Sequence, residues 1–169
     1  VESVLEQRGK FSYHVFLSFK PQDTGKTFTA HLHRNLVKAG FHVFKCDEKE
    51  RIGDLKSRLK KGIEQSRMSV IVLSQNYASS ERCLDELVMI LEQKRNFGHI
   101  VLPVFYYVDP SDVRKQKGSF GEESFRVVNL ESEEERIRKV KGCSKALKEV
   151  ADLGGMPLQN QADGSSIRI

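Results

Sequence analysis

The chain of 169 residues contains no tryptophan and only three cysteines. The cysteines are odd in number and have no metal-like spacing, which indicates a reduced, intracellular protein. Two of them, Cys83 and Cys143, lie beside apolar helical positions, so we expect packing residues rather than nucleophiles. No apolar run approaches the roughly 20 residues of a membrane span, and no signal-like segment is visible at the N-terminus.

The composition is that of an ordinary globular domain, with 38% hydrophobic and 30% charged residues. The net charge of +5 permits an anionic partner but does not require nucleic acid. Basic residues are densest at 49–61, which we interpret either as a solvated helix face or as a positive rim around a phosphate-bearing ligand or docking partner. The five histidines form no set with ligand geometry, so no metal site is expected.

Short apolar runs of strand type alternate with amphipathic helical segments from residue 13 onward. We expect strands at 13–19, 41–44, 68–73 and 100–105 and helices at 25–39, 54–65, 79–91 and 132–153. Met156–Leu158 is our best candidate for a fifth strand, after a helix ended by Gly154 and Gly155. This alternation predicts βαβ units in an α/β fold, an open doubly wound sheet with helices on both faces.

In such a sheet, ligands bind where the carboxyl ends of the strands meet. Four segments follow the predicted strands at this edge: 18–24, 45–54, 74–82 and 106–114. The helix over 79–91 leaves the third of them and carries Arg82 and Glu86 one turn apart. Its apolar stripe lies more than a quarter turn from Glu86, counting about 100° per residue. We interpret Glu86 either as a solvated acid or as a functional carboxylate at the rim of the crevice.

P-loop, receiver and flavodoxin domains share this architecture, but this sequence lacks the residues that each of them needs. Gly25, Lys26 and Thr27 suggest a P-loop, but Lys20 stands where that motif needs a glycine, and Pro21 stiffens the loop. A receiver domain needs acids after the first strand, and a flavodoxin needs a loop rich in hydroxyls and glycine there. Ser18 and Lys20 stand where a receiver domain has those acids, and Ser74 stands where it has an Asp after the third strand. The sequence Lys-Pro-Gln-Asp at 20–23 is not a flavodoxin-type phosphate loop.

Several motifs instead resemble those of one family. They are Tyr-His-Val-Phe-Leu-Ser-Phe at 13–19, Ser-Gln-Asn-Tyr-Ala-Ser-Ser at 74–80, Cys-Leu-Asp-Glu-Leu at 83–87, Val-Asp-Pro-Ser-Asp-Val-Arg at 108–114 and Ala-Leu-Lys-Glu-Val-Ala-Asp-Leu-Gly-Gly at 146–155. From about residue 13 to 164 the chain resembles the TIR (Toll/interleukin-1 receptor) domain of plant disease-resistance proteins with nucleotide-binding (NB) and leucine-rich-repeat (LRR) regions. The resemblance implies a flavodoxin-like three-layer fold whose five-stranded parallel sheet has the order 2-1-3-4-5.

The resemblance also implies a function. Members signal by self-association in innate immunity, and many cleave NAD+ when assembled, with NAD+ as substrate and no prosthetic group. The matching catalytic residue is Glu86, and candidates for the NAD+ pocket are Ser18, Phe19, Lys20, Pro21, Ile52, Gly53, Ser74, Tyr77 and Arg82. Self-association surfaces would include His31 and Gly154. The breaking nicotinamide–ribose bond develops positive charge, which a carboxylate beside the ribose can stabilise.

The resemblance further sets the expected organisation of the chain. We expect an N-terminal extension at 1–12, the TIR domain at 13–158, and a linker or truncation tail at 159–169. The chain reads as a fragment, with NB and LRR domains beyond residue 169 and other TIR domains as partners. A cytoplasmic protein with a possible nuclear pool is expected, without a membrane span.

This chain departs from the family pattern in ways that bear on activity. Lys20, Pro21 and Gln22 replace Arg-Gly-Glu, Cys46 replaces an aspartate, Ala30 replaces a serine, and Arg82 replaces a tryptophan. We hypothesise that Arg82 forms a weak exposed pair with Glu86, lowers its pKa and competes with the ribose hydroxyls. Alternatively, Arg82 contacts a ligand phosphate. Two functions therefore stay open, an NAD+-cleaving signalling domain and a catalytically impaired module that only assembles.

Overall fold

A single five-stranded sheet organises the computed structural model, which describes residues 11–46 and 52–158, with the main chain alone at 52–54. Its strands are β1 (Tyr13–Ser18), β2 (Val43–Lys45), β3 (Ser66–Leu73), β4 (Ile100–Tyr106) and β5 (Met156–Leu158). The order is β2-β1-β3-β4-β5 and every neighbouring pair is parallel. The predicted topology, including the fifth strand, is confirmed.

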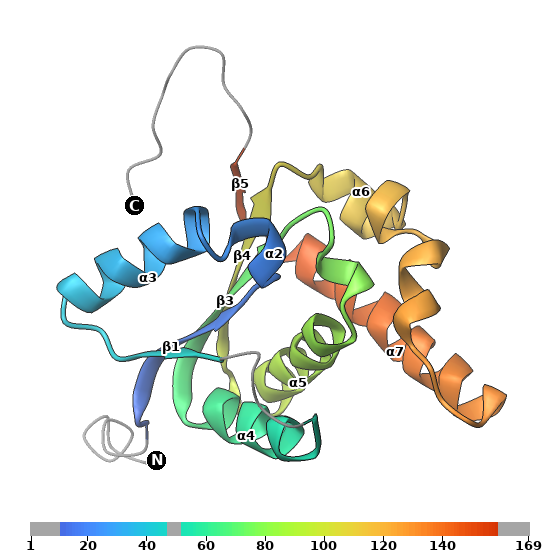
Figure 1. The fold of residues 1–169 in the computed structure, drawn as a ribbon, viewed down its shortest axis with the longest axis horizontal. Helices are drawn as coiled ribbons and strands as arrows, with labels where there is room; N and C mark the ends of the chain where they lie inside the picture. Colours follow the sequence, from blue (N-terminus) through green and yellow to red (C-terminus); the bar gives the residue numbers. More distant parts are fainter. Residues whose placement is uncertain (1–10, 47–51, 159–169) are drawn as a thin grey trace, which may run out of the picture.

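Helices cover both faces of this sheet (Figure 1). The α-helices are α2 (Pro21–Thr24), α3 (Phe28–Lys38), α4 (Ile52–Glu64), α5 (Glu81–Phe97), α6 (Pro110–Lys115) and α7 (Glu133–Asp152). Three 3-10 helices are η1 (Tyr77–Ser79), η2 (Gly118–Phe120) and η3 (Glu122–Val127). Alternate strand residues face opposite sides, which gives two separate apolar clusters.

The two clusters differ in how many elements contribute to them. On one face, Phe16, Ile71 and Phe105 pack with buried residues of α4, α5 and α7. On the other face, Val15, Val70 and Val104 pack with Leu32 of α3. The helix α5 therefore lies in the thicker layer, between α4 and α7, and its first turns begin at the carboxyl edge of the sheet (Figure 1).

Local chemistry explains where the structure differs from the predicted elements. The helix expected over 25–39 is α3, which begins three residues later, at Phe28, and the polar turn expected before it contains the short helix α2. Pro21 suits the start of α2, because a residue at the first helical position has no need of an N–H donor. The stretch after Asp109, which looked irregular, contains α6; its start combines a cap by Asp109 with Pro110. Gly154, with φ of 67°, follows α7 as predicted.

The described part of the chain contains neither a membrane-spanning helix nor a cluster of metal ligands. Within residues 11–46 and 52–158, no helix is long and apolar enough to cross a membrane. The same residues contain no group of three or more His, Cys, Asp or Glu side chains arranged to hold a metal ion.

Candidate functional site

Glu86 lies on the buried side of α5, with 1% of its surface exposed. Ser80 caps this helix by accepting a hydrogen bond from the Cys83 backbone N–H at 3.3 Å. The alternative of a solvated acid is therefore wrong, because the carboxyl group is covered although it lies off the apolar stripe. The first turns of α5 contact β1 and η1, so positions outside the stripe are also covered.

Ser18 and Tyr77 form the hydrogen-bonded surroundings of Glu86. The Ser18 hydroxyl, at the carboxyl end of β1, donates to Glu86 Oε2 at 2.5 Å. Ser18 Oγ also lies 2.7 Å from the Tyr77 hydroxyl, whose oxygen is in turn 3.1 Å from the Cys83 carbonyl, so the one Tyr77 hydrogen can go to either partner. The Ser18 and Tyr77 side chains are fully buried. Both residues were expected in an NAD+ pocket; the structure brings them to Glu86 but covers them from solvent.

Arg82 closes the same region from the solvent side. Its Nε atom lies 3.6 Å from Glu86 Oε1, and its Nη2 donates to the Phe19 carbonyl at 3.4 Å. The Arg82 side chain is only 14% exposed. The predicted pairing of Arg82 with Glu86 is confirmed, but the pair is not exposed as expected. Arg82 thus connects α5 with the segment that follows β1.

Burial governs the charge of Glu86. Desolvation raises its pKa to about 7, although the Ser18 hydrogen bond and the Arg82 charge act in the opposite direction. Arg82 therefore stabilises the ionised form as hypothesised, but the expected net lowering of the pKa is wrong. A carboxyl group with a pKa near 7 can hold or release a proton at neutral pH.

Asp23 is a residue of this region whose role was not recognised in the sequence. Its carboxylate accepts hydrogen bonds from Ser74 Oγ at 2.6 Å, from the Asn76 backbone N–H at 2.8 Å and from Asn76 Nδ2 at 2.9 Å. Burial opposes these bonds, yet together they hold the pKa of Asp23 below its usual range. Asp23 thereby joins the segments after β1 and β3. The sequence could have indicated this role of Asp23, because the segments after β1 and β3 both follow strands at the same edge of the sheet.

The remaining pocket candidates are distributed around this edge. Phe19 is buried, whereas Lys20 and Pro21 are half-buried at the start of α2. Ser74 is 1% exposed and is engaged with Asp23 rather than with Glu86. Ile52 and Gly53 begin α4, but their side chains lie outside the described residues, as do all atoms of Asp47 and Arg51.

The two self-association candidates are both accessible. His31 lies exposed on α3, and Gly154 lies exposed after α7. The cysteines behave as packing residues, as predicted. Burial raises the pKa of Cys83 to about 12 and that of Cys143 to about 11, so neither thiol forms a thiolate at neutral pH.

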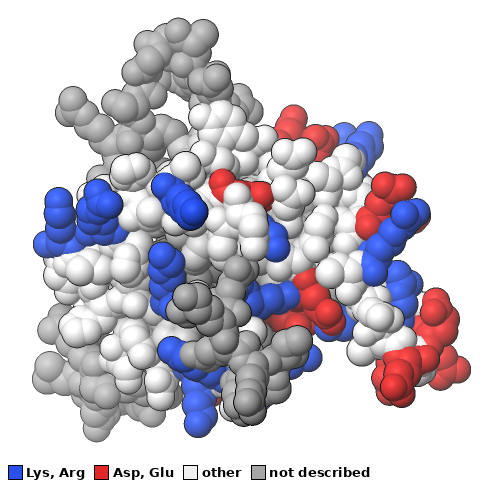
Figure 2. All heavy atoms as spheres, viewed as in Figure 1, with Lys and Arg blue, Asp and Glu red and all other residues white. Residues whose placement is uncertain are grey.

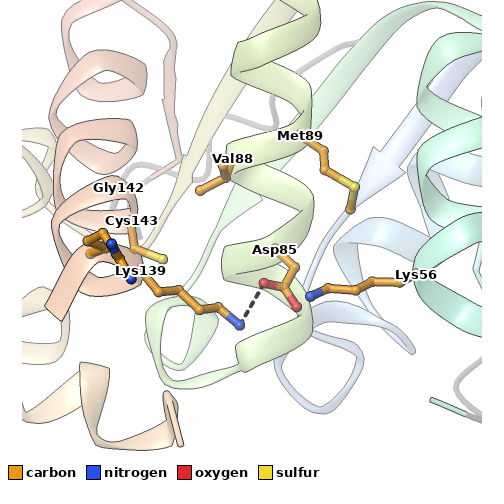
Figure 3. Close-up of a pocket in the computed structure, with 8 residues that line it drawn as sticks. Lys56, Asp85, Val88, Met89, Lys139, Gly142 and Cys143 are labelled. Atoms are coloured by element: carbon orange, nitrogen blue, oxygen red, sulfur yellow. Dashed lines mark ion pairs between the residues drawn. The ribbon is translucent and has the colours of Figure 1, made fainter. Parts of the chain in front are cut away.

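A hollow of about 300 Å³ lies between α4, α5 and α7, away from Glu86 (Figure 3). It is lined by Lys56, Asp85, Val88, Met89, Arg138, Lys139, Gly142 and Cys143. Lys139 Nζ lies 3.1 Å from Asp85 Oδ1 and 2.8 Å from Glu81 Oε1, and thereby connects α7 to the start of α5. Glu86 does not line this hollow, although it follows Asp85 in sequence.

Charge is unevenly spread over the molecular surface. Figure 2 shows acidic side chains gathered at the tip where α7 begins, whereas basic side chains are spread over the rest of this face. On α4, Lys56, Arg58, Lys60 and Lys61 are exposed. The predicted basic face is therefore present, while Lys49 and Arg51 lie outside the described residues.

The fold and site define an α/β protein of flavodoxin-like topology with a buried carboxyl group beneath the carboxyl edge of its sheet. A family profile described as TIR domain matches residues 12–167. The chain therefore belongs to the TIR domain family.

Its relatives include plant disease-resistance proteins. The chain is 46% identical over 162 residues to disease resistance protein RUN1 of Vitis rotundifolia, covering 93% of this chain and 12% of that protein. It is 42% identical over 164 residues to TMV resistance protein N of Nicotiana glutinosa, covering 94% of this chain and 14% of that protein. It thus spans about an eighth of the length of these relatives.

A solved structure gives a close structural match. The TIR domains of the activated Roq1 resistosome, which directly recognises the pathogen effector XopQ, superpose with a TM-score of 0.78 at 45% sequence identity. The match covers 91% of this chain and 92% of that one. The likeness therefore extends over nearly the whole domain.

Proposed function

We propose that this TIR domain signals in plant innate immunity by self-association and that it cleaves NAD+ in the assembled state. The similarity to resistance proteins and to the resistosome TIR domains supports the signalling role. Its partners would be other TIR domains and the NB and LRR regions of a longer receptor, in the cytoplasm with a nuclear pool.

The observation that carries the enzymatic part is the position and charge of Glu86. The carboxyl group lies at the carboxyl edge of a doubly wound sheet, where ligands bind in such folds. Its pKa of about 7 means that a sizeable fraction is ionised at neutral pH. An ionised carboxylate beside the ribose would stabilise the positive charge that develops as nicotinamide leaves.

The reaction balances with water as the second substrate. The bond between the nicotinamide nitrogen and the ribose carbon breaks, and nicotinamide leaves with the bonding electrons. Water then attacks the ribose carbon and releases a proton, which gives ADP-ribose. Lys20, half-buried at the start of α2, would approach the pyrophosphate.

Burial of Glu86 requires that the site open before it can work. Arg82 covers the carboxyl group and holds the Phe19 carbonyl, so substrate cannot reach Glu86 in this arrangement. We infer that assembly must displace Arg82. The same contacts favour the second candidate function, in which Arg82 keeps the site closed and the domain acts only as an interaction and oligomerisation module.

Nicotinamide release by the purified domain at high protein concentration tests this proposal. We expect release that Glu86→Ala abolishes. Arg82→Trp removes the contact that closes the site and should raise the rate about five- to tenfold, as expected for the loss of about 1 kcal/mol of ground-state pairing. Arg95→Trp makes the same change near the other end of α5 and serves as the control.

The outcomes separate the two functions. An unchanged or lower rate in Arg82→Trp contradicts the closing role of Arg82, and a raised KM for NAD+ would instead show that Arg82 binds a phosphate. No release from any variant, even with crowding agents that force assembly, would leave the interaction module as the function.

A further inference from the structure

The Ser18, Tyr77 and Glu86 side chains form one continuous hydrogen-bonded chain inside the protein. Their exposed fractions are 0%, 0% and 1%, so neither Ser18 nor Tyr77 can contact a ligand in this arrangement. The two contacts that connect them measure 2.7 Å and 2.5 Å, both at Ser18 Oγ. Ser18 is therefore the link between an ionisable carboxyl group and a fully buried phenol.

The number of available hydrogens determines the direction of each hydrogen bond when Glu86 is ionised. A serine hydroxyl carries one hydrogen and can donate only once. That hydrogen goes to Glu86 Oε2, so Ser18 Oγ must accept from the Tyr77 hydroxyl. The carboxylate then receives a hydrogen bond that is itself reinforced by a second donor.

When Glu86 is protonated, the same atoms form the same hydrogen bonds with donor and acceptor exchanged. A protonated Glu86 donates to Ser18 Oγ, and Ser18 then donates to the Tyr77 oxygen. The Tyr77 hydrogen is free to go to the Cys83 carbonyl, which lies 3.1 Å away. No donor or acceptor in the chain is left unsatisfied in either state, which matters because an unpaired buried polar group is costly.

We propose that Ser18 and Tyr77 are positioning residues that hold the Glu86 carboxyl in one orientation and let it change charge by reversing their hydrogen bonds. The inference uses the proposed function only for the importance of Glu86. It adds that the protonation of this carboxyl group is controlled by Ser18 on β1 and Tyr77 on η1, which are buried beside it in this arrangement.

Other ionisable groups around Glu86 lie outside the hydrogen bonds that join it to Ser18 and Tyr77. Arg82 on the same helix favours the ionised carboxylate, and the neighbouring Asp85 disfavours it. The buried thiol of Cys83 stays protonated at neutral pH, and the charge of Lys20, at the start of α2, acts on that thiol. None of these groups changes in the experiment below, so their influence on Glu86 is common to all variants.

The test is the pKa of Glu86, measured from the side-chain carboxyl carbon shift by NMR, with Glu86→Gln to assign the signal. Ser18→Ala removes the direct donor to the ionised form and should raise the pKa by about one to two units. Tyr77→Phe keeps the ring but removes the second donor, and should raise the pKa by a smaller amount.

The double variant gives the sharpest result. If Tyr77 acts only through Ser18, adding Tyr77→Phe to Ser18→Ala leaves the Glu86 pKa unchanged, although Tyr77→Phe alone shifts it. Controls are Ser69→Ala, which removes a buried hydroxyl bonded to His99, and Tyr106→Phe, which removes a phenol packed on the other face of the sheet. Both should leave the Glu86 pKa unaltered.

Additive shifts, or no shift in either single variant, would overturn the proposal. Far-ultraviolet circular dichroism checks folding, and Tyr77→Phe decides alone if Ser18→Ala does not fold. The readout does not depend on NAD+ cleavage, so an inactive domain with the expected shifts would refute the proposed function and leave this inference intact. In an active domain, the pH midpoint of nicotinamide release should rise in the same order.

Discussion

Replacing Glu86 with glutamine should change how the stability of the domain depends on pH. Glutamine keeps the length of the side chain and can accept the Ser18 hydrogen bond, but it has no charge to bury. Burial raises the pKa of Glu86 from its ordinary 4.5 to about 7. Between these values the folded state keeps a proton that the unfolded state has lost.

The sign and size of the effect follow from this difference. Because the folded state binds more protons than the unfolded state, stability falls as pH rises from about 4.5 through about 7. At roughly 1.4 kcal/mol per unit, the full loss is on the order of 3 kcal/mol. The glutamine variant should lack this loss, so it should become the more stable of the two chains by that amount between pH 4.5 and 8.

The comparison isolates Glu86 from other titrating groups. Burial lowers the pKa of His99 to about 4, so the histidine weakens the fold as pH falls below its ordinary value of 6.5. His99 is present in both chains, however, and its contribution cancels in their difference. At low pH, Arg82 lies beside an uncharged side chain in both proteins, so the stability difference measured there is the reference for higher pH.

Urea unfolding of both chains in steps of pH provides the measurement. The expected result is a free-energy difference that grows with pH and levels off above about pH 8. Parallel curves would show that Glu86 titrates normally and that its burial does not govern its charge. A difference that grows in favour of the natural chain would mean that the Arg82 pair outweighs desolvation.

Two further predictions concern backbone space and assembly. Gly155→Ala should destabilise the domain by about 2 kcal/mol or more in urea unfolding, because the new Cβ would lie 2.2 Å from the Pro103 carbonyl oxygen. Gly142→Ala on α7 is the matched control of opposite sign, since nothing lies within 4 Å of its new Cβ and helix propensity favours alanine by about 0.5–1 kcal/mol; equal losses at both sites would contradict the packing argument. His31→Ala should weaken self-association measured by light scattering at high concentration, with His33→Ala as control, and unchanged association would exclude the exposed face of α3.

The sequence was sufficient for the fold because its signals are local. Buried parallel strands such as β3 and β4 read as continuous apolar runs, and glycines mark where α7 ends. Even the short β5 was predicted at its observed residues. The short helix α2 was missed because Pro21 was taken only as a loop residue, although proline also suits the first turn of a helix.

The site was predicted in its residues but not in its environment. A helical wheel ranks positions around α5 alone, whereas the burial of Glu86 depends on what covers the start of that helix. Ser18 and Tyr77 are 59 residues apart, and Ser18 and Glu86 are 68 apart. The local sequence pattern around these three residues does not indicate contacts over such distances along the chain. The exposed character assigned to Glu86 and Arg82 was therefore wrong for one common reason.

The balance between the closed and open site depends more on burial than on the Arg82 pair. The two Arg82 contacts, at 3.6 Å and 3.4 Å, are long for charge-assisted hydrogen bonds, so breaking them costs little. Opening also returns an ionised Glu86 to water, which recovers its hydration and brings its pKa back toward 4.5. Opening should therefore become easier as pH rises through about 7, the same range in which the carboxylate form needed for catalysis appears. Deprotonation and access to Glu86 are thus linked.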